Sequence, residues 1–169
     1  MTAATETIWQ KIEYSPVGDF VASSEWAFPT LETIHVIALV TVLGSIAVMD
    51  LRLLGLASNS SAITQVARNT VRLTWMAFVL AAATGLLMFA GKAASYMINP
   101  YFLIKMGLLA LAGLNMAYFH LVTWKAVNNW DKGVVIPPMV KLSGGLSLLF
   151  WVLVVFFGRA IGFTLGMFY

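Results

Sequence analysis

The stretch Phe28-Pro29-Thr30-Leu31-Glu32-Thr33-Ile34-His35, followed by an apolar run as far as Asp50-Leu51-Arg52, decides the fold. It predicts the start of a membrane-spanning helix, because the run between His35 and Asp50 is free of charge and a span needs about 20 apolar residues. Pro29 suits a first helical position, where its missing N–H would have no partner. Glu32 and His35 are three residues apart and share one helix face. Ionisable groups inside a span are costly to bury and are typical of functional sites.

The composition indicates an integral membrane protein. The chain has 169 residues, of which 60% are hydrophobic and 10% are charged, whereas soluble domains carry about 25% charged residues. It has no cysteine, which excludes disulfides, thiolate metal sites and cysteine nucleophiles. The net charge is +3 and the pI is about 9.3, but the basic residues lie at helix ends rather than in one patch. They therefore indicate membrane topology, and we expect membrane lipid rather than nucleic acid as the partner.

Four apolar segments predict an all-α, integral membrane four-helix bundle within residues 28–169. The expected spans are about 30–56, 71–90, 101–123 and 140–166. Residues 1–27 lack the basic start and apolar core of a signal peptide. They predict an interfacial amphipathic segment of two short helical pieces broken at Pro16. Ser58-Asn59-Ser60-Ser61 can cap a continuation into the second span, and Pro100 is expected to open the third.

The distribution of Lys and Arg predicts the orientation of the bundle. The first and third loops are flanked by Arg52, Arg68, Arg72, Lys125, Lys132 and Lys141, whereas only Lys11 and Lys92 lie outside the spans on the other side. Cytoplasmic loops are enriched in basic residues. We therefore expect a multi-pass protein of the bacterial inner membrane with both termini outside.

Small residues recur at intervals of four within the spans. They are Ala81 and Gly85, Gly113 and Ala117, and the run Gly158, Gly162 and Gly166. This spacing is typical of close helix–helix contacts in membranes. The last run could alternatively leave room for a flat ligand such as a porphyrin.

Four polar residues are predicted to share one depth on the outer side. At 1.5 Å per residue, His35, Lys105 and Arg159 lie within about 8–11 Å of the outer boundary, and Glu32 lies one turn above His35. A glutamate among two cations and an imidazole can neutralise a site inside lipid. The alternative is that Lys105 and Arg159 extend independently toward the surface.

A second polar cluster is expected near the cytoplasmic ends of the spans. His120 lies about 20 residues into the third span, with Asn115 above it and Asp50 and Arg52 at a similar depth. The rise between the levels of His35 and His120 is about 20 Å, so the two histidines cannot ligate one haem or one zinc ion within a single chain. Ser143 and Ser147 have no plausible base beside them.

Several motifs resemble known bacterial membrane families. Leu31-Glu32-Thr33-Ile34-His35-Val36-Ile37, with Gly44 and Asp50-Leu51-Arg52-Leu53-Leu54-Gly55, is similar to the first helix of an uncharacterised four-helix family. Thr84-Gly85, Tyr101-Phe102-Leu103-Ile104-Lys105 and Asn115 resemble the CopD-like copper-resistance domain. The His of helix one and the Lys of helix three resemble the HemJ-like protoporphyrinogen oxidases, which bind haem b. These resemblances imply His35 as an axial haem or metal ligand and Lys105 as the residue opposite it.

The leading hypothesis is a protein that binds haem b for electron transfer or porphyrin redox chemistry. His35 would ligate the iron, and Arg159 would pair with a propionate. Lys105 would be the second ligand or, as we favour, a partner of a propionate, and Glu32 would orient or balance the site. One alternative is a non-enzymatic accessory subunit that packs in a homo-oligomer or a larger membrane complex. Another is a carrier of copper or a small solute that uses Met49, Met88 and Met106. The sequence leaves open whether the protein is an enzyme.

Overall fold

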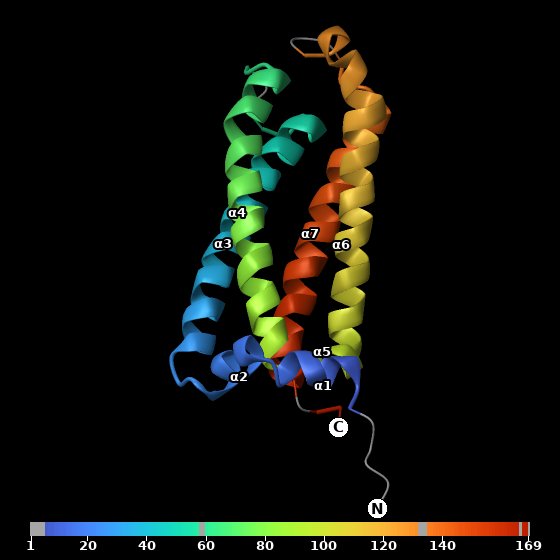
Figure 1. Ribbon diagram of the computed structural model, residues 1–169. Coiled ribbons are helices and arrows are strands. Elements are labelled where there is room, and N and C mark those ends of the chain that lie inside the picture. Colours follow the sequence, from blue (N-terminus) through green and yellow to red (C-terminus); the bar gives the residue numbers. More distant parts are fainter. Residues whose placement is uncertain (1–5, 58–59, 132–134, 166, 169) are drawn as a thin grey trace, which may run out of the picture.

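Four long helices form the body of the protein (Figure 1). The computed structural model describes residues 6–57, 60–131, 135–165 and 167–168. All regular structure in these residues is helical, and the four helices are long and apolar enough to cross a membrane: α3 (Ala27–Leu54), α4 (Ile63–Gly91), α6 (Pro100–Tyr118) with its continuation through η1 (Phe119–Thr123) and η2 (Trp124–Asn129), and α7 (Pro138–Thr164). The predicted all-α transmembrane bundle is therefore confirmed.

Three short helices lie across one end of the bundle (Figure 1). They are α1 (Ile8–Glu13), α2 (Pro16–Ser23) and α5 (Ala93–Ile98). We call this the terminus end, and the opposite end, with the connections 55–62 and 130–137, the loop end. The break at Pro16 is as predicted, whereas α5 occupies a segment that was expected to be only a short loop. The predicted position of the N-terminal segment in the membrane interface stays a prediction.

Backbone contacts fix α2 against the end of α4. A Cβ atom at Gly18 would lie 2.7 Å from the carbonyl oxygen of Ala90, and one at Gly91 would lie 2.9 Å from a methyl group of Val21. Only glycine permits so close an approach. At the neighbouring helix, the carboxylate of Glu13 accepts a hydrogen bond of 3.2 Å from the N–H of Ala94 at the start of α5.

Two helix starts differ from the expectation. Helix α3 begins at Ala27, whose N–H donates to the Ser24 hydroxyl, so Pro29 is its third residue rather than its first. Helix α4 does continue back to Ile63, but its N-cap, Ala62, provides no side-chain cap. The predicted serine cap is thus wrong for the described residues of that loop, Ser60 and Ser61. Ser58 and Asn59 lie outside the described residues.

Asp131, from the connection between α6 and α7, caps α4 instead. Its carboxylate accepts hydrogen bonds from the N–H and the hydroxyl of Thr64, at 2.8 and 2.9 Å. Its backbone carbonyl accepts from the N–H of Ile63 at 3.3 Å. A side chain distant in sequence therefore satisfies the free donors of this helix. Pro100 opens α6 as predicted, with Asn99 as its N-cap.

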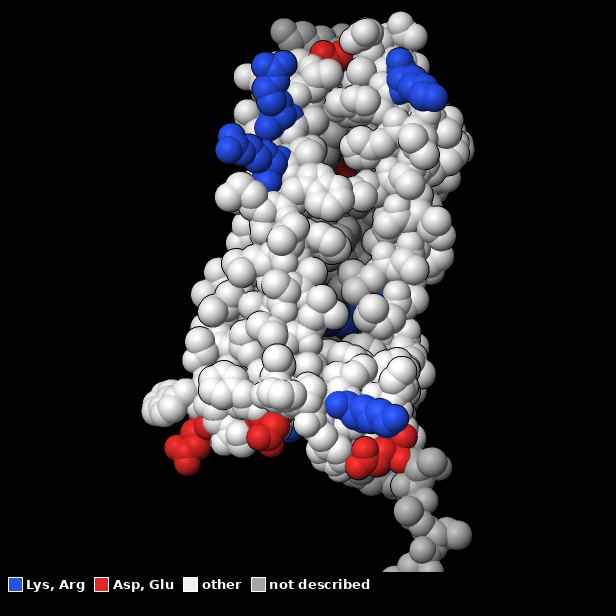
Figure 2. Space-filling view, in the orientation of Figure 1, with Lys and Arg blue, Asp and Glu red and all other residues white. Residues whose placement is uncertain are grey.

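The long helices form two hairpins that join along one side only. Helix α3 packs along α4, α6 along α7, and α3 along α7, whereas α4 and α6 share no extended contact within the described residues. Figure 2 shows a hollow along the face between α4 and α6. We call it the lateral groove. At the loop end, the helices enclose an apolar cluster, the loop-end core: Leu53, Ile63, Phe119, Val127, Trp130, Ile136 and Val140.

Candidate functional site

His35 is held on the surface of α4 by a glycine. The histidine lies in the third turn of α3 and is half-buried. A Cβ atom at Gly85 would lie only 3.0 Å from Cε1 of the ring. The imidazole therefore packs directly on the backbone of α4, and a larger residue at position 85 would displace it. The predicted close contact of Gly85 is thus a contact with this side chain.

The Thr84 hydroxyl connects His35 to the backbone of α4. It lies 2.8 Å from the carbonyl oxygen of Leu80 and 3.0 Å from Nδ1 of His35, and the backbone of Ala81 also bonds the imidazole. Because a hydroxyl has a single proton, Nδ1 donates to Thr84 when that proton is directed to Leu80, and Nε2 then carries the lone pair. A hydrogen bond at one ring nitrogen is the usual way in which proteins orient a ligating histidine.

Lys105 lies beside His35, on the other hairpin. Its half-buried side chain follows the backbone of α7 at Gly158, where a Cβ atom would lie 3.6 Å from Nζ and 3.7 Å from Cε. The Lys105 ammonium group is within electrostatic range of the His35 imidazole. Counted from the ends of their helices at the terminus end, His35, Thr84, Lys105 and Gly158 all lie at depths of about 8–12 Å.

Aromatic rings cover this level on the side of the terminus end. Phe89 of α4 stacks on Phe102 of α6 with ring centres 5.6 Å apart, and Tyr96 of α5 lies 5.2 Å from Phe102. Burial raises the pKa of the Tyr96 phenol, and the negative charge of Glu32 raises it further. We call these three rings the aromatic floor. The floor joins α4 to α6 at one end, while the lateral groove separates them farther along.

Glu32 and Arg159 share this depth but lie on the exterior. Both residues are exposed. The Arg159 guanidinium group lies over the ring of Phe163, 5.1 Å from its centre, and Glu32 acts on Tyr96 rather than on His35. The structure therefore brings together His35 and Lys105 but not the whole predicted layer. Arg159 follows the alternative of extending independently along the surface.

The residues of the second predicted cluster are distributed among separate contacts. Asn115 and Ser143 exchange two hydrogen bonds, of 2.9 and 3.0 Å, between α6 and α7. Arg52 is buried and donates through Nε to the carbonyl oxygen of Ser61 at 3.0 Å. His120 is exposed and bonds the carbonyl oxygen of Met116 in its own helix at 3.0 Å. Asp50 faces α7, so these four side chains do not form one site.

The structure also corrects two other expectations. Gly113 and Gly162 have open space where a Cβ atom would be, and Ala117 is exposed, so these residues make no close helix contacts within the described chain. Gly166 lies outside the described residues. Ser147 does have an acidic group beside it, because its hydroxyl interacts with the carboxyl group of Asp50.

Three residues contact His35 or Lys105 without having been predicted to do so. They are Thr84, Gly85 and Gly158. The available signal was their depth, since Thr84-Gly85 and Gly158 lie about as far from their helix ends as His35 and Lys105 do from theirs.

The fold and this site define a transmembrane four-helix bundle with a half-buried, oriented histidine and a lysine near the terminus end. The chain belongs to a family of unknown function, DUF6644, which it matches over residues 18–164. The prediction of an uncharacterised membrane family is thus confirmed. No curated protein and no solved structure matches the chain. None of these comparisons links it to the CopD-like domain or the HemJ-like oxidases, so those resemblances stay predictions.

Proposed function

We propose that the protein binds haem b at His35 and acts in electron transfer or porphyrin redox chemistry. The observation that carries this proposal is the 3.0 Å contact between Nδ1 of His35 and the Thr84 hydroxyl, which would orient the ring with Nε2 as the axial ligand. When bound, haem would supply one-electron chemistry. The chain would contribute ligation, orientation and charge compensation.

The donor set fits a haem better than a bare metal ion. Among the described residues, there is no group of three or more His, Cys, Asp or Glu side chains that could hold a metal ion. A haem brings four nitrogen ligands of its own and needs only one from the protein. The three methionines weighed for copper do not all share one place, since Met49 packs against the loop-end core whereas Met88 and Met106 lie toward the terminus end of α4 and α6.

Lys105 would pair with a haem propionate. Its flexible stem lies along Gly158, and its ammonium group is within electrostatic range of the imidazole that would hold the iron. The lateral groove would admit a flat apolar ring from the membrane side (Figure 2), and the aromatic floor would contact one of its edges. Arg159 and Glu32 have no part in this proposal, because both lie on the exterior.

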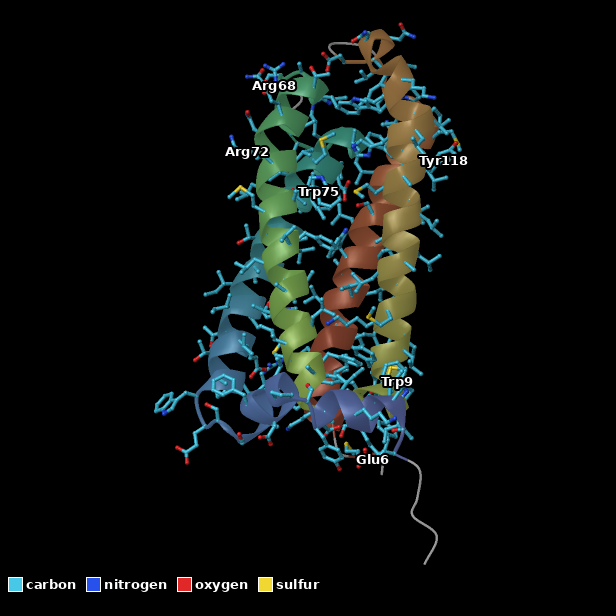
Figure 3. All side chains as sticks on the ribbon, in the orientation of Figure 1. Glu6, Trp9, Arg68, Arg72, Trp75 and Tyr118 are labelled. Carbon is cyan, nitrogen blue, oxygen red and sulfur yellow. The ribbon has the colours of Figure 1, made fainter. Side chains whose placement is uncertain are left out.

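The charges at the two ends favour the predicted orientation. Figure 2 shows most acidic side chains at the terminus end, with basic ones beside them, and further basic side chains toward the loop end, next to an acidic group. Arg68 and Arg72 lie on the outer side of α4 near the loop end (Figure 3). We propose a bacterial inner-membrane protein with the loop end in the cytoplasm and the His35 site on the outer side.

An accessory-subunit role is the second candidate, and the outer face of α6 favours it. Gly107 and Gly113 have open space around their Cα atoms, and Ala110 and Ala117 are exposed on the same helix. Small residues of this kind permit another membrane helix to pack closely. The face could thus contact a second copy or a larger complex, and this role is compatible with haem binding.

Absorbance of the purified protein tests the haem proposal. The protein is expressed with haem supplementation, solubilised in mild detergent and separated from free haem by gel filtration. We expect a Soret band that co-elutes with the monodisperse protein and a pyridine haemochrome of the b type. A folded protein that carries no haem after expression and after titration with haemin would contradict the proposal.

A further inference from the structure

Asp50 is a buried acid that the proposed haem site does not use. It lies in the loop-end half of α3, and only 5% of its surface is exposed. Its Oδ2 atom is buried and has no hydrogen-bond partner among the residues that the structure describes. Its helix neighbours Met49 and Leu53 pack with the loop-end core, so the carboxyl group lies next to apolar side chains. A buried polar atom without a partner is uncommon in proteins and calls for an explanation.

Close packing brings Asp50 against α7. A Cβ atom at Gly144 would lie 3.1 Å from Cβ of Leu53 and 3.3 Å from the carbonyl oxygen of Asp50. One turn farther along α7, the hydroxyl of Ser147 interacts with the Asp50 carboxyl group. The acid is therefore held between two helices, with one hydroxyl beside it.

The charged and polar groups around Asp50 have other partners. On α3, Arg52 donates to Ser61. Asn115 and Ser143 satisfy each other. The ionisable residues on the elements packed around α3 at this end are exposed: Arg68 and Arg72 on α4, Lys141 on α7, and His120 and Lys125 on the continuation of α6. None of these forms an ion pair with Asp50 in the described part of the chain.

The lateral groove reaches an acidic group in this half of the bundle. Figure 2 shows acidic atoms deep in the hollow toward the loop end. A carboxylate without a counter-charge is costly in an apolar span, and a bound proton removes that charge. A metal cation would require several free oxygen ligands, whereas those of Asn115 and Ser143 are engaged with each other.

We propose that Asp50, with Ser147 beside it, is an intramembrane proton-binding site. The proton binds the carboxylate at the unpartnered Oδ2, and Ser147 positions the group by its contact with the carboxyl. This inference is independent of haem binding, since it concerns a different level of the bundle.

Infrared spectroscopy of the full-length protein in lipid nanodiscs tests this site. We expect the C=O stretching band of a protonated carboxylic acid at neutral pH, a downshift of this band in D2O, and its loss as the pH rises. The band should disappear in Asp50→Asn and persist in the matched control Asp19→Asn, which removes an exposed acid from α2.

Ser147→Ala keeps the test decisive if Asp50→Asn does not fold. Loss of the hydroxyl should shift the carboxylic band to higher frequency without removing it. The proposal is wrong if the band survives in Asp50→Asn, does not respond to Ser147→Ala, or fails to exchange in D2O. It is equally wrong if Asp50 stays ionised at every pH and its carboxylate band shifts with the sodium concentration.

Discussion

The two halves of the bundle are built in opposite ways. In the loop-end half, large apolar side chains such as Phe119 and Trp130 fill the space between the helices. In the terminus-end half, His35 lies on the backbone of Gly85 and Lys105 lies along Gly158. In this half, polar side chains pack where any residue other than glycine at positions 85 and 158 would place its Cβ atom. The glycines thus position two functional groups, whereas the loop-end core provides packing.

This contrast separates two kinds of buried polar group. Nδ1 of His35 contacts the Thr84 hydroxyl, and Lys105 is within electrostatic range of the ring. Asp50 has an unpartnered oxygen and no cation in contact within the described residues. The first arrangement suits a cofactor that carries its own negative groups, and the second suits a proton. Five experiments can break or sharpen this comparison.

The largest expected effect concerns membrane topology, because a single cysteine is either labelled from outside the cell or not labelled at all. The chain has no cysteine, so single cysteines can be introduced at the exposed positions Glu25 and Ser60. A membrane-impermeant thiol reagent applied to intact cells should label position 25 and not position 60, because basic residues favour a cytoplasmic loop end. Labelling of position 60 alone would show that the loop end faces outward, opposite to the proposed topology.

Gly85→Leu should remove nearly all bound haem. Even the first added carbon would lie 3.0 Å from the His35 ring, so the imidazole must leave its place, and overpacking costs about 1–3 kcal/mol of stability. Haem content per folded protein and the thermal midpoint provide the measurements. The control is Gly44→Leu, where nothing lies within 4 Å of an added Cβ atom. Equal haem content in both variants would refute the role of Gly85.

Thr84→Val should weaken haem binding about 10–100-fold, the range found when a hydrogen-bond partner of a metal-ligating histidine is removed. The change preserves shape but removes the hydroxyl that contacts Nδ1 of His35, and Thr84→Ser should restore binding. Haemin titration of the apoprotein measures the affinity. Thr74→Val is the matched control, since it breaks a similar 2.7 Å contact with Ser45 away from His35. A loss of affinity in the control alone would argue against the proposed orientation of His35.

Lys105→Met should weaken haem binding about tenfold, as expected from the loss of one charge-assisted hydrogen bond of about 1.5 kcal/mol. Arg159→Leu should have the smallest effect, with an unchanged spectrum and affinity, because Arg159 is exposed over Phe163. The same haemin titration compares the two variants. If Arg159→Leu loses haem and Lys105→Met does not, the assignment of the two cations must be exchanged.

The helices and their depths could be predicted because an apolar run and a fixed rise per residue determine both. The rotation of each helix about its axis could not. Lipid surrounds the bundle, so apolar residues such as Leu114 lie on the outside and no polar face indicates the interior. The depth of Glu32 and Arg159 in the bundle was therefore predicted, but not that both side chains lie on its exterior. The cap provided by Asp131 also could not be predicted, because Asp131 and the start of α4 are far apart in sequence and meet only in the folded chain.

The central claim is that His35 alone among the histidines holds a haem, and a paired substitution tests it most directly. His35→Ala and His120→Ala are purified side by side, and their Soret absorbance per folded protein is compared with that of the unmodified protein. The two residues lie in opposite halves of the bundle, about 20 Å apart in depth, and His120 is exposed. We predict that His35→Ala abolishes the Soret band and that His120→Ala retains most of it. Retention of the band in His35→Ala, or its loss in both folded variants, would contradict the account.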